Sequence, residues 1–305
     1  MNRVLPPPRP QPFYHGVPEG NEGMEEYQSG AADLILRPFG MFSNVDQVVN
    51  SCYLVELGIL EPFYVDGSEF LFRDAAREGN PWEYYFEQPF EGVTPAGRRM
   101  AEFTDGYLTP YHHRPEDELS ILLPPRDRAV IEPVIRKYIR PQRAVVEAYE
   151  AMKAIHRPEE KGACLIRGVG KLRDMNNAAV KLHEEVYGDE RYFEVYMDAM
   201  EQSGVERFIV YSDAEEVLEM ARERLGDRVE WTDTRRTAQG ELHHSCEEGQ
   251  YELGLEMLAQ SAMMADAKVF IHGPSSITNF VQCDRPELPC IDVYEEYTRQ
   301  FPDRH

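Results

Sequence analysis

The sequence lacks the features that secreted and membrane-spanning proteins need. It contains no run of about 18 apolar residues, so we expect no membrane-spanning helix. Residues 1–8 lack the apolar core of a signal peptide. The cysteines are few, odd in number and scattered, which is typical of a reducing compartment and not of a disulfide framework. They are Cys52, Cys164, Cys246, Cys283 and Cys290. We therefore expect a cytoplasmic protein.

Positive charge is scarce as well. The chain has 32 basic and 55 acidic residues, which gives a formal net charge of −23. Such a surface repels nucleic acids and anionic membranes over most of its area, so we expect neither as a partner. An anionic small molecule would need a local basic pocket, for which Arg167 and Lys171 are the natural candidates.

Two common signatures of phosphate binding are missing, because the chain has neither Gly-Lys-Ser/Thr nor Gly-x-Gly-x-x-Gly. It has instead the segment Gly162–Lys171, in which an apolar, strand-like run ends in Arg167 and leads into a glycine-rich turn. A buried strand end fixes the arginine, the glycines let the backbone approach a ligand, and a planar guanidinium binds two phosphate oxygens. The segment predicts a phosphate site; the alternative is a surface charge, which is commoner for an arginine at a strand end.

The length of 305 residues exceeds what one hydrophobic core usually supports, which favours two domains. Residues 1–30 are rich in proline and glycine and show no periodicity, so they predict an extended tail. The polar segment His156–Lys161 predicts the link between an N-terminal domain, residues 31–158, and a C-terminal domain, residues 159–305.

In both parts strands alternate with helices, the pattern of parallel sheets with right-handed crossovers. In the first part we expect a strand at Asp33–Leu36, a helix at Val45–Leu57, a strand at Pro62–Val65 and helices over residues 124–160, broken at Pro141. In the second part we expect strands at Ala163–Arg167, Arg207–Tyr211, Val229–Trp231, Lys268–His272 and Cys290–Val293. The helices between them are expected at Glu190–Ser203, at Ala214–Leu225 with Asp213 as N-cap, at Tyr251–Ala265 and after Ser275.

Several segments, in the same order along the chain, resemble the superfamily of the nodulation fucosyltransferase and the α-1,6- and protein O-fucosyltransferases. They are Gly40–Val49, Asn80–Glu87, Gly162–Lys171, Arg207–Asp213 and Val269–Ser276. The resemblance covers about residues 34–293. It implies an α/β fold of the GT-B type, in which two Rossmann-like βα domains face a cleft.

The resemblance also implies a chemistry. In this superfamily a strand-end arginine, here Arg167, grips the diphosphate of GDP-fucose, and Lys171 helps it or orients a carboxylate. Gly168, Ser212 and Asp213 fall at donor-binding positions. An inverting transfer builds charge on the departing diphosphate, so fixed positive groups there lower the barrier. Because the chain has no Asp-x-Asp, we expect a reaction without a metal or a cofactor, with GDP-fucose or a related nucleotide sugar as substrate.

A second phosphate-binding device is predicted at Ser275 and Ser276. Both lie at the expected opening of a helix, where free N–H groups and the helix dipole attract an anion. The alternative is that one of these serines only caps the helix.

The chain departs from the superfamily pattern at several positions. Leu165 stands where relatives have a histidine implicated in nucleotide binding, and Val169-Gly170 replaces Thr-Asp, which leaves the choice of guanine and fucose open. Glu256 is a candidate to replace the aspartate that binds the base, or a solvated side chain. Asp174 lies near the position of a proposed general base, although strict alignment puts Met175 there; the alternative is an exposed loop aspartate.

The remaining candidates have two interpretations each. Ser43, Asn44 and Gln47 lie near the first loop, where they contact the acceptor or, for the last two, only cap the helix. The aromatic run Trp82–Phe86 is expected in the core in preference to a sugar site. The pairs His112-His113 and His243-His244 lack the spacing of a metal site, so we expect no metal.

These features predict an inverting, fucosyltransferase-like enzyme that moves a sugar from a GDP-sugar to a hydroxyl of a glycan, peptide or small molecule. One alternative is the same fold with a different nucleotide sugar. Another is a sugar-nucleotide-binding protein without activity, which the missing histidine favours. Retention of Arg167, Lys171, Ser275 and Ser276 favours the enzyme.

Overall fold

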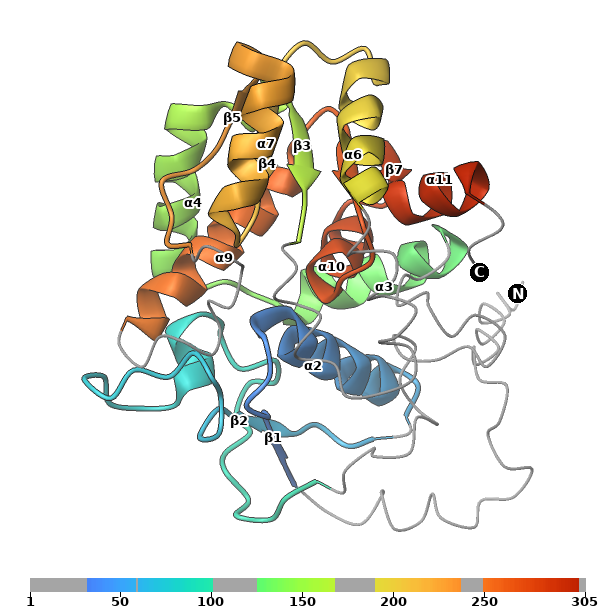
Figure 1. Cartoon of the computed structure of the whole chain (residues 1–305). Helices are drawn as coiled ribbons and strands as arrows, with labels where there is room; N and C mark the ends of the chain where they lie inside the picture. Colours follow the sequence, from blue (N-terminus) through green and yellow to red (C-terminus); the bar gives the residue numbers. More distant parts are fainter. Residues whose placement is uncertain (1–31, 59, 101–124, 168–189, 237–248, 302–305) are drawn as a thin grey trace, which may run out of the picture.

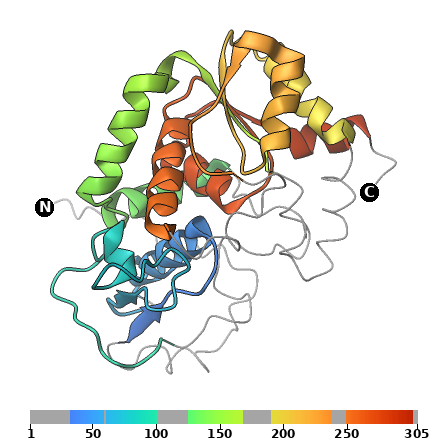
Figure 2. The ribbon, with the colours of Figure 1, turned by 60° about the vertical axis from the view of Figure 1, so that its left-hand side comes forward.

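The computed structural model describes residues 32–58, 60–100, 125–167, 190–236 and 249–301, and Figures 1 and 2 show it from two sides. No helix within these ranges is long and apolar enough to cross a membrane. Gly168, Lys171 and Asp174 lie outside the described residues.

The N-terminal part of the chain contains a small βαβ unit. Strand β1 (Asp33–Ile35) pairs in parallel with β2 (Tyr64–Asp66), and helix α2 (Met41–Glu56) lies between them in the sequence. The helix packs into the core, and Val48 and Cys52 have no exposed surface. This unit lies below the larger sheet in Figure 1.

The C-terminal part is built on a five-stranded parallel sheet in the order β5-β4-β3-β6-β7. Its strands are β3 (Gly162–Leu165), β4 (Phe208–Tyr211), β5 (Val229–Glu230), β6 (Phe270–His272) and β7 (Cys290–Asp292). The central strands are short, buried and apolar on both faces, as expected for a parallel sheet with helices on each side. The strand order reverses at β3, because β4 and β5 lie on one side of it and β6 and β7 on the other.

Helices cover both faces of this sheet (Figure 2). One hydrophobic cluster contains side chains of α6 (Glu190–Gln202), α7 (Glu215–Leu225) and α11 (Val293–Gln300). The cluster on the other face contains side chains of α4 (Arg143–His156), α9 (Gln250–Ala265) and α10 (Ser276–Asp284). This second cluster continues into α2 and α3 (Pro125–Tyr138), so one core joins the two sheets of the described residues. The domain boundaries proposed above stay a prediction.

Helix α2 and the end of the chain differ most from the expected elements. Helix α2 begins at Met41 and not at Val45, because the buried face extends one turn further toward the N-terminus. The last strand ends at Asp292, and Val293 opens α11, a helix that the sequence did not indicate. The Asp292 carboxylate accepts hydrogen bonds from two backbone N–H groups of the first turn (2.9 and 3.3 Å), which is the usual action of an N-cap.

The prediction that Asp213 caps α7 is wrong. Ala214 occupies the N-cap position, and its backbone N–H donates to Oγ of Ser212 (3.2 Å). The carboxylate of Asp213 turns toward Arg167 instead, since an ion pair across neighbouring strand ends is available to it.

Candidate functional site

The carboxyl ends of three strands bring the predicted segments to one edge of the sheet. Arg167 follows β3, Ser212 and Asp213 follow β4, and Ser275 and Ser276 follow β6. In Figure 1 this edge faces the N-terminal part of the chain. Ligands of open parallel sheets bind in the crevice where the strand order reverses, which here lies between β3 and β6.

A pocket opens at this edge, with about 540 Å³ of empty space including its mouth. The polar residues that line it include Arg167, Ser212, Asp213, Thr234, Arg235, Glu256 and Gln260. Its apolar lining residues include Leu165, Leu253, Met257, Met264 and Ile277. An apolar hollow with a few polar groups is the usual setting for a small ligand.

Arg167 reaches across from the end of β3 to the end of β4. Its Nη2 lies 3.2 Å from Oδ2 of Asp213, and the two side chains are 19% and 12% exposed. The ion pair fixes the orientation of the guanidinium, and the carboxylate partly neutralises its positive charge. Because a guanidinium carries five N–H donors, it can bind a carboxylate and a phosphate at the same time.

Glu256 extends from α9 into the same pocket. Burial raises the pKa of its carboxyl, against the opposing effects of a backbone hydrogen bond from Arg235 and the positive charges of Arg235 and Arg236. A carboxyl with a raised pKa in a pocket is a candidate functional group. Glu256, Arg167 and Asp213 thus line the same pocket, and their roles stay a prediction.

Sequence reasoning missed the segment after β5. Nε2 of Gln260 donates to Oγ1 of Thr232 (2.8 Å) and to Oγ1 of Thr234 (3.0 Å), which ties α9 to this segment. Thr234 and Arg235 of this segment line the pocket. Their position just beyond a strand end is the signal that could have found them, because it is the same signal that selected Ser212.

Leu165 stands where relatives have a histidine, and another histidine, His272, lies beside it in the sheet. Leu165 of β3 pairs in register with His272 of β6, but His272 has no exposed surface. Its Nε2 lies 2.7 Å from Nε2 of Gln282 on α10, and burial lowers its pKa to about 3, so the ring is neutral. Leu165 lines the pocket and His272 does not.

Ser275 caps α10. Its Oγ accepts a hydrogen bond from the backbone N–H of Thr278 (3.2 Å) and lies 2.8 Å from Oγ1 of Thr278, which in turn donates to the carbonyl of Gly273 (2.9 Å). Ser275 is only 2% exposed. Ser276 is partly exposed, so of the two serines it has the more accessible hydroxyl.

The first turns of α2 and α10 meet at this edge. Oγ of Ser43 lies 3.3 Å from Oγ of Ser276. Asn44 is buried, and its amide donates to the carbonyls of residues 37, 39 and 40 and accepts from the N–H of Arg37. It therefore shapes the loop that leads into α2. Gln47 is partly buried one turn further along, and its carbonyl accepts a hydrogen bond from Ser51 (2.9 Å).

Known structures resemble this architecture. A crystal structure of fucosyltransferase NodZ from Bradyrhizobium matches it with a TM-score of 0.51 at 13% identity, over 87% of this chain and 96% of that chain. A crystal structure of NodZ alpha-1,6-fucosyltransferase soaked with GDP-fucose matches with a TM-score of 0.50 at 14% identity, over 86% and 95% of the two chains. No family model matches the chain, and no curated protein sequence matches it.

The chain has the GT-B fold of the fucosyltransferases. At these identities the likeness concerns the fold, and what the site does is argued from its residues.

In this GT-B chain Trp82, Tyr85 and Phe86 of the aromatic run are core, as the sequence predicted, and Tyr84 is partly buried against that core. Trp82, Tyr85 and Phe86 are at most 2% exposed, and Nε1 of Trp82 donates to the carbonyl of Glu87 (3.1 Å). These rings therefore do not present a face to a sugar.

No three His, Cys, Asp or Glu side chains gather into a metal-binding group within the described ranges. The histidine pairs at 112–113 and 243–244 lie outside those ranges. Independence from metals stays a prediction.

A second hollow lies at the opposite edge of the GT-B sheet, before β3, β4 and β6. Arg157, Lys161, Arg207 and Lys268 line it. Nζ of Lys161 donates to the carbonyl of His156 at the end of α4 (2.6 Å) and pairs with Glu230 (2.7 Å). Cations are favourable at the C-terminal ends of helices, so Lys161 stabilises the end of α4.

Proposed function

We propose that this chain is an inverting, metal-independent glycosyltransferase that moves a sugar, fucose or a related one, from a GDP-sugar to a hydroxyl acceptor. The observation that carries the proposal is the ion pair of Arg167 and Asp213 on the wall of a pocket at the carboxyl ends of β3 and β4. The fold supports the same assignment, because the similar structure of NodZ comes from a crystal soaked with GDP-fucose.

In the proposed reaction the acceptor hydroxyl attacks C1 of the sugar from the face opposite the diphosphate. Negative charge then grows on the diphosphate, and groups already fixed at that place lower the barrier. Arg167, oriented by Asp213, would bind the phosphate oxygens, and the N-terminus of α10 with Ser276 would bind them from the other side of the crevice. Gly168 and Lys171 would be the other members of this group of phosphate-binding residues.

The nucleoside would occupy the pocket wall formed by α9. Glu256 is suited to the ring N–H groups of guanine, because a carboxylate accepts hydrogen bonds. The positive charge of Arg235 opposes the rise in the pKa of Glu256 that burial causes. Ser212 would contact the same part of the donor. For the acceptor we propose the edge formed by Ser43 and Gln47, with Asn44 shaping the loop, and Asp174 as general base.

A panel of GDP-, UDP-, TDP- and CMP-sugars tests the donor. A ligand present at 100 times its dissociation constant stabilises the folded state by about 2.7 kcal/mol, which a thermal melt detects easily. We expect the shift with GDP and GDP-sugars. A shift with only a UDP-sugar would transfer the proposal to the same fold with a different donor.

A sugar-nucleotide-binding protein without activity is the second candidate, and it is favoured by Leu165, an apolar lining residue where relatives have a histidine. Incubation of a GDP-sugar with the protein and a mixture of hydroxyl acceptors separates the two. Saturable binding without transfer or hydrolysis over long incubation would support the binding protein, and release of GDP would support the enzyme.

A further inference from the structure

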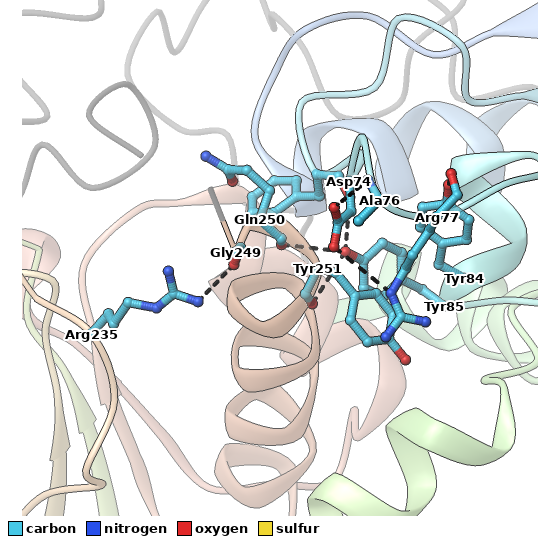
Figure 3. A network of polar contacts seen from close by, with 10 residues as sticks. Asp74, Ala76, Arg77, Tyr84, Tyr85, Arg235, Gly249, Gln250 and Tyr251 are labelled. Atoms are coloured by element: carbon cyan, nitrogen blue, oxygen red, sulfur yellow. Dashed lines mark hydrogen bonds and ion pairs between the residues drawn. The ribbon is translucent and has the colours of Figure 1, made fainter. Parts of the chain in front are cut away.

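The first turn of α9 is held from two sides, as Figure 3 shows. From the segment after β5, Nη2 of Arg235 donates to the carbonyl of Gly249 (2.7 Å). From the N-terminal part, the hydroxyl of Tyr85 lies 3.3 Å from the carbonyl of Gln250 and 3.2 Å from that of Tyr251. The same hydroxyl lies 2.9 Å from the carbonyl of Phe72.

Tyr85 makes this contact from a fully buried position. Burial raises the pKa of its hydroxyl, so the group stays protonated and can donate. One hydroxyl hydrogen is thus shared among carbonyls that belong to a loop of the N-terminal part and to the start of α9. A buried hydroxyl without such partners would be costly, so the contact favours one relative position of the two parts.

Gly254 lets Tyr85 approach the helix. A Cβ atom on Gly254 would lie 2.5 Å from the hydroxyl oxygen of Tyr85 and 2.6 Å from its ring carbons. Glycine is among the least favourable residues inside a helix. Its presence in the second turn of α9 is explained by the tyrosine, because any larger residue would push the ring away from the carbonyls.

The ring of Tyr251 adds to the contact between Tyr85 and the start of α9. Tyr251 lies with its ring centre 5.6 Å from that of Tyr85, and the guanidinium of Arg77 covers the ring of Tyr251 at 3.4 Å. Arg77 also pairs with Asp74 (3.8 Å), in the loop that precedes Tyr84. Figure 3 shows these side chains gathered against the start of α9.

Helix α9 contacts Tyr85 with its first turn and forms a wall of the pocket further along. Glu256 and Gln260 follow the first turn by one to three helical turns and line the pocket. A helix transmits a shift of its first turn to the rest of its length, because the packed core around it allows little bending. The position of the pocket wall relative to α2 therefore depends on the contact at Tyr85.

We infer that Tyr85, resting on Gly254, is a positioning residue that aligns the donor pocket with the part of the chain that carries Ser43. It acts through α9 and does not touch the donor. The inference rests on the proposed function. Donor affinity should depend little on this contact, since Arg235 and Gln260 still hold α9 to the sheet. The rate of transfer should depend on it strongly, because attack requires the acceptor and C1 to be aligned.

Tyr85→Phe in the full chain removes the hydroxyl and keeps the ring. Tyr84→Phe is the matched control, because the hydroxyl of Tyr84 donates to the carbonyl of Arg77 within its own loop and not to α9. Gly254→Ala is a second variant, which displaces the tyrosine ring without changing it. For each protein we would measure hydrogen exchange of the amides of residues 250–256, the dissociation constant for GDP by calorimetry, and kcat for sugar transfer.

For Tyr85→Phe and Gly254→Ala we expect at least tenfold faster exchange in this segment than for Tyr84→Phe. We expect kcat to fall at least tenfold while the dissociation constant for GDP changes less than threefold. Exchange equal to the control, or a lower melting temperature with kcat unchanged, would overturn the inference. If the wild-type protein neither binds GDP nor transfers a sugar, the proposed function fails, and the exchange comparison still decides whether Tyr85 positions α9.

Discussion

Arg167→Ala removes the guanidinium at the end of β3 and with it the ion pair to the carboxylate of Asp213 at 3.2 Å. Two effects follow, and they can be measured separately. Loss of a fixed donor at the place where charge develops costs about 2.7–4 kcal/mol of transition-state stabilisation, or on the order of 10²–10³ in rate, by analogy with oxyanion-binding groups. We expect this loss in kcat for transfer.

The second effect is on stability. Removing one partner of a fully buried ion pair costs about 3–5 kcal/mol. Here the side chains are 19% and 12% exposed, so solvent screens the remaining charge and we expect about 1–3 kcal/mol. The double variant Arg167→Ala/Asp213→Ala removes the uncompensated carboxylate. It should recover most of the stability and none of the transfer.

The assay combines urea unfolding with initial rates of GDP release at saturating GDP-sugar. Arg224→Ala serves as the control, because Arg224 pairs with Glu201 on the exposed surface of α7 and α6, and its loss should change neither quantity appreciably. Arg167→Lys should rescue transfer only in part, since an ammonium group cannot make the two-pronged contact. Wild-type kcat in folded Arg167→Ala would refute the reasoning about the site.

Three further predictions concern charge, loop structure and metals. Burial raises the pKa of Glu256, so the folded state binds the proton more tightly than the unfolded state, and its stability falls as pH rises from the ordinary carboxyl value through the raised one. Glu256→Gln should therefore melt at a higher temperature than the wild type at about pH 7 and show little difference below about pH 4; equal melting at both values would contradict this. Asn44→Ala should lower the free energy of unfolding by about 2–4 kcal/mol, because it removes several buried hydrogen bonds worth about 1 kcal/mol each, among them the one from the backbone N–H of Arg37. A loss below about 1 kcal/mol in urea unfolding would count against that role. Transfer should survive EDTA, and activity that EDTA abolishes and Mn²⁺ restores would rule out the metal-free mechanism.

Local periodicity was sufficient to predict most of the helices and strands. The strand before Arg167, the strand before Ser212 and the helix from residue 250 lie within two residues of their predicted bounds, because their signals are runs of neighbouring apolar residues. The exceptions are capping decisions. Asp213 and Asp292 are both aspartates at the end of a strand, and only the second caps a helix, since only the first has an arginine on the adjacent strand end.

The sequence by itself determined which residues would stand at strand ends, and so it selected Arg167, Ser212 and Ser276 for one edge of the sheet. Only the tertiary structure decided which of these ends are neighbours, that the hydroxyl of Ser275 caps α10, and that Glu256 lines the same pocket as Arg167. It also decided that Tyr85 rests on Gly254, a contact between residues far apart in the chain. The physical reason is that periodicity reports the burial of each residue along its own element, whereas strand order and helix packing depend on how all the elements share one core.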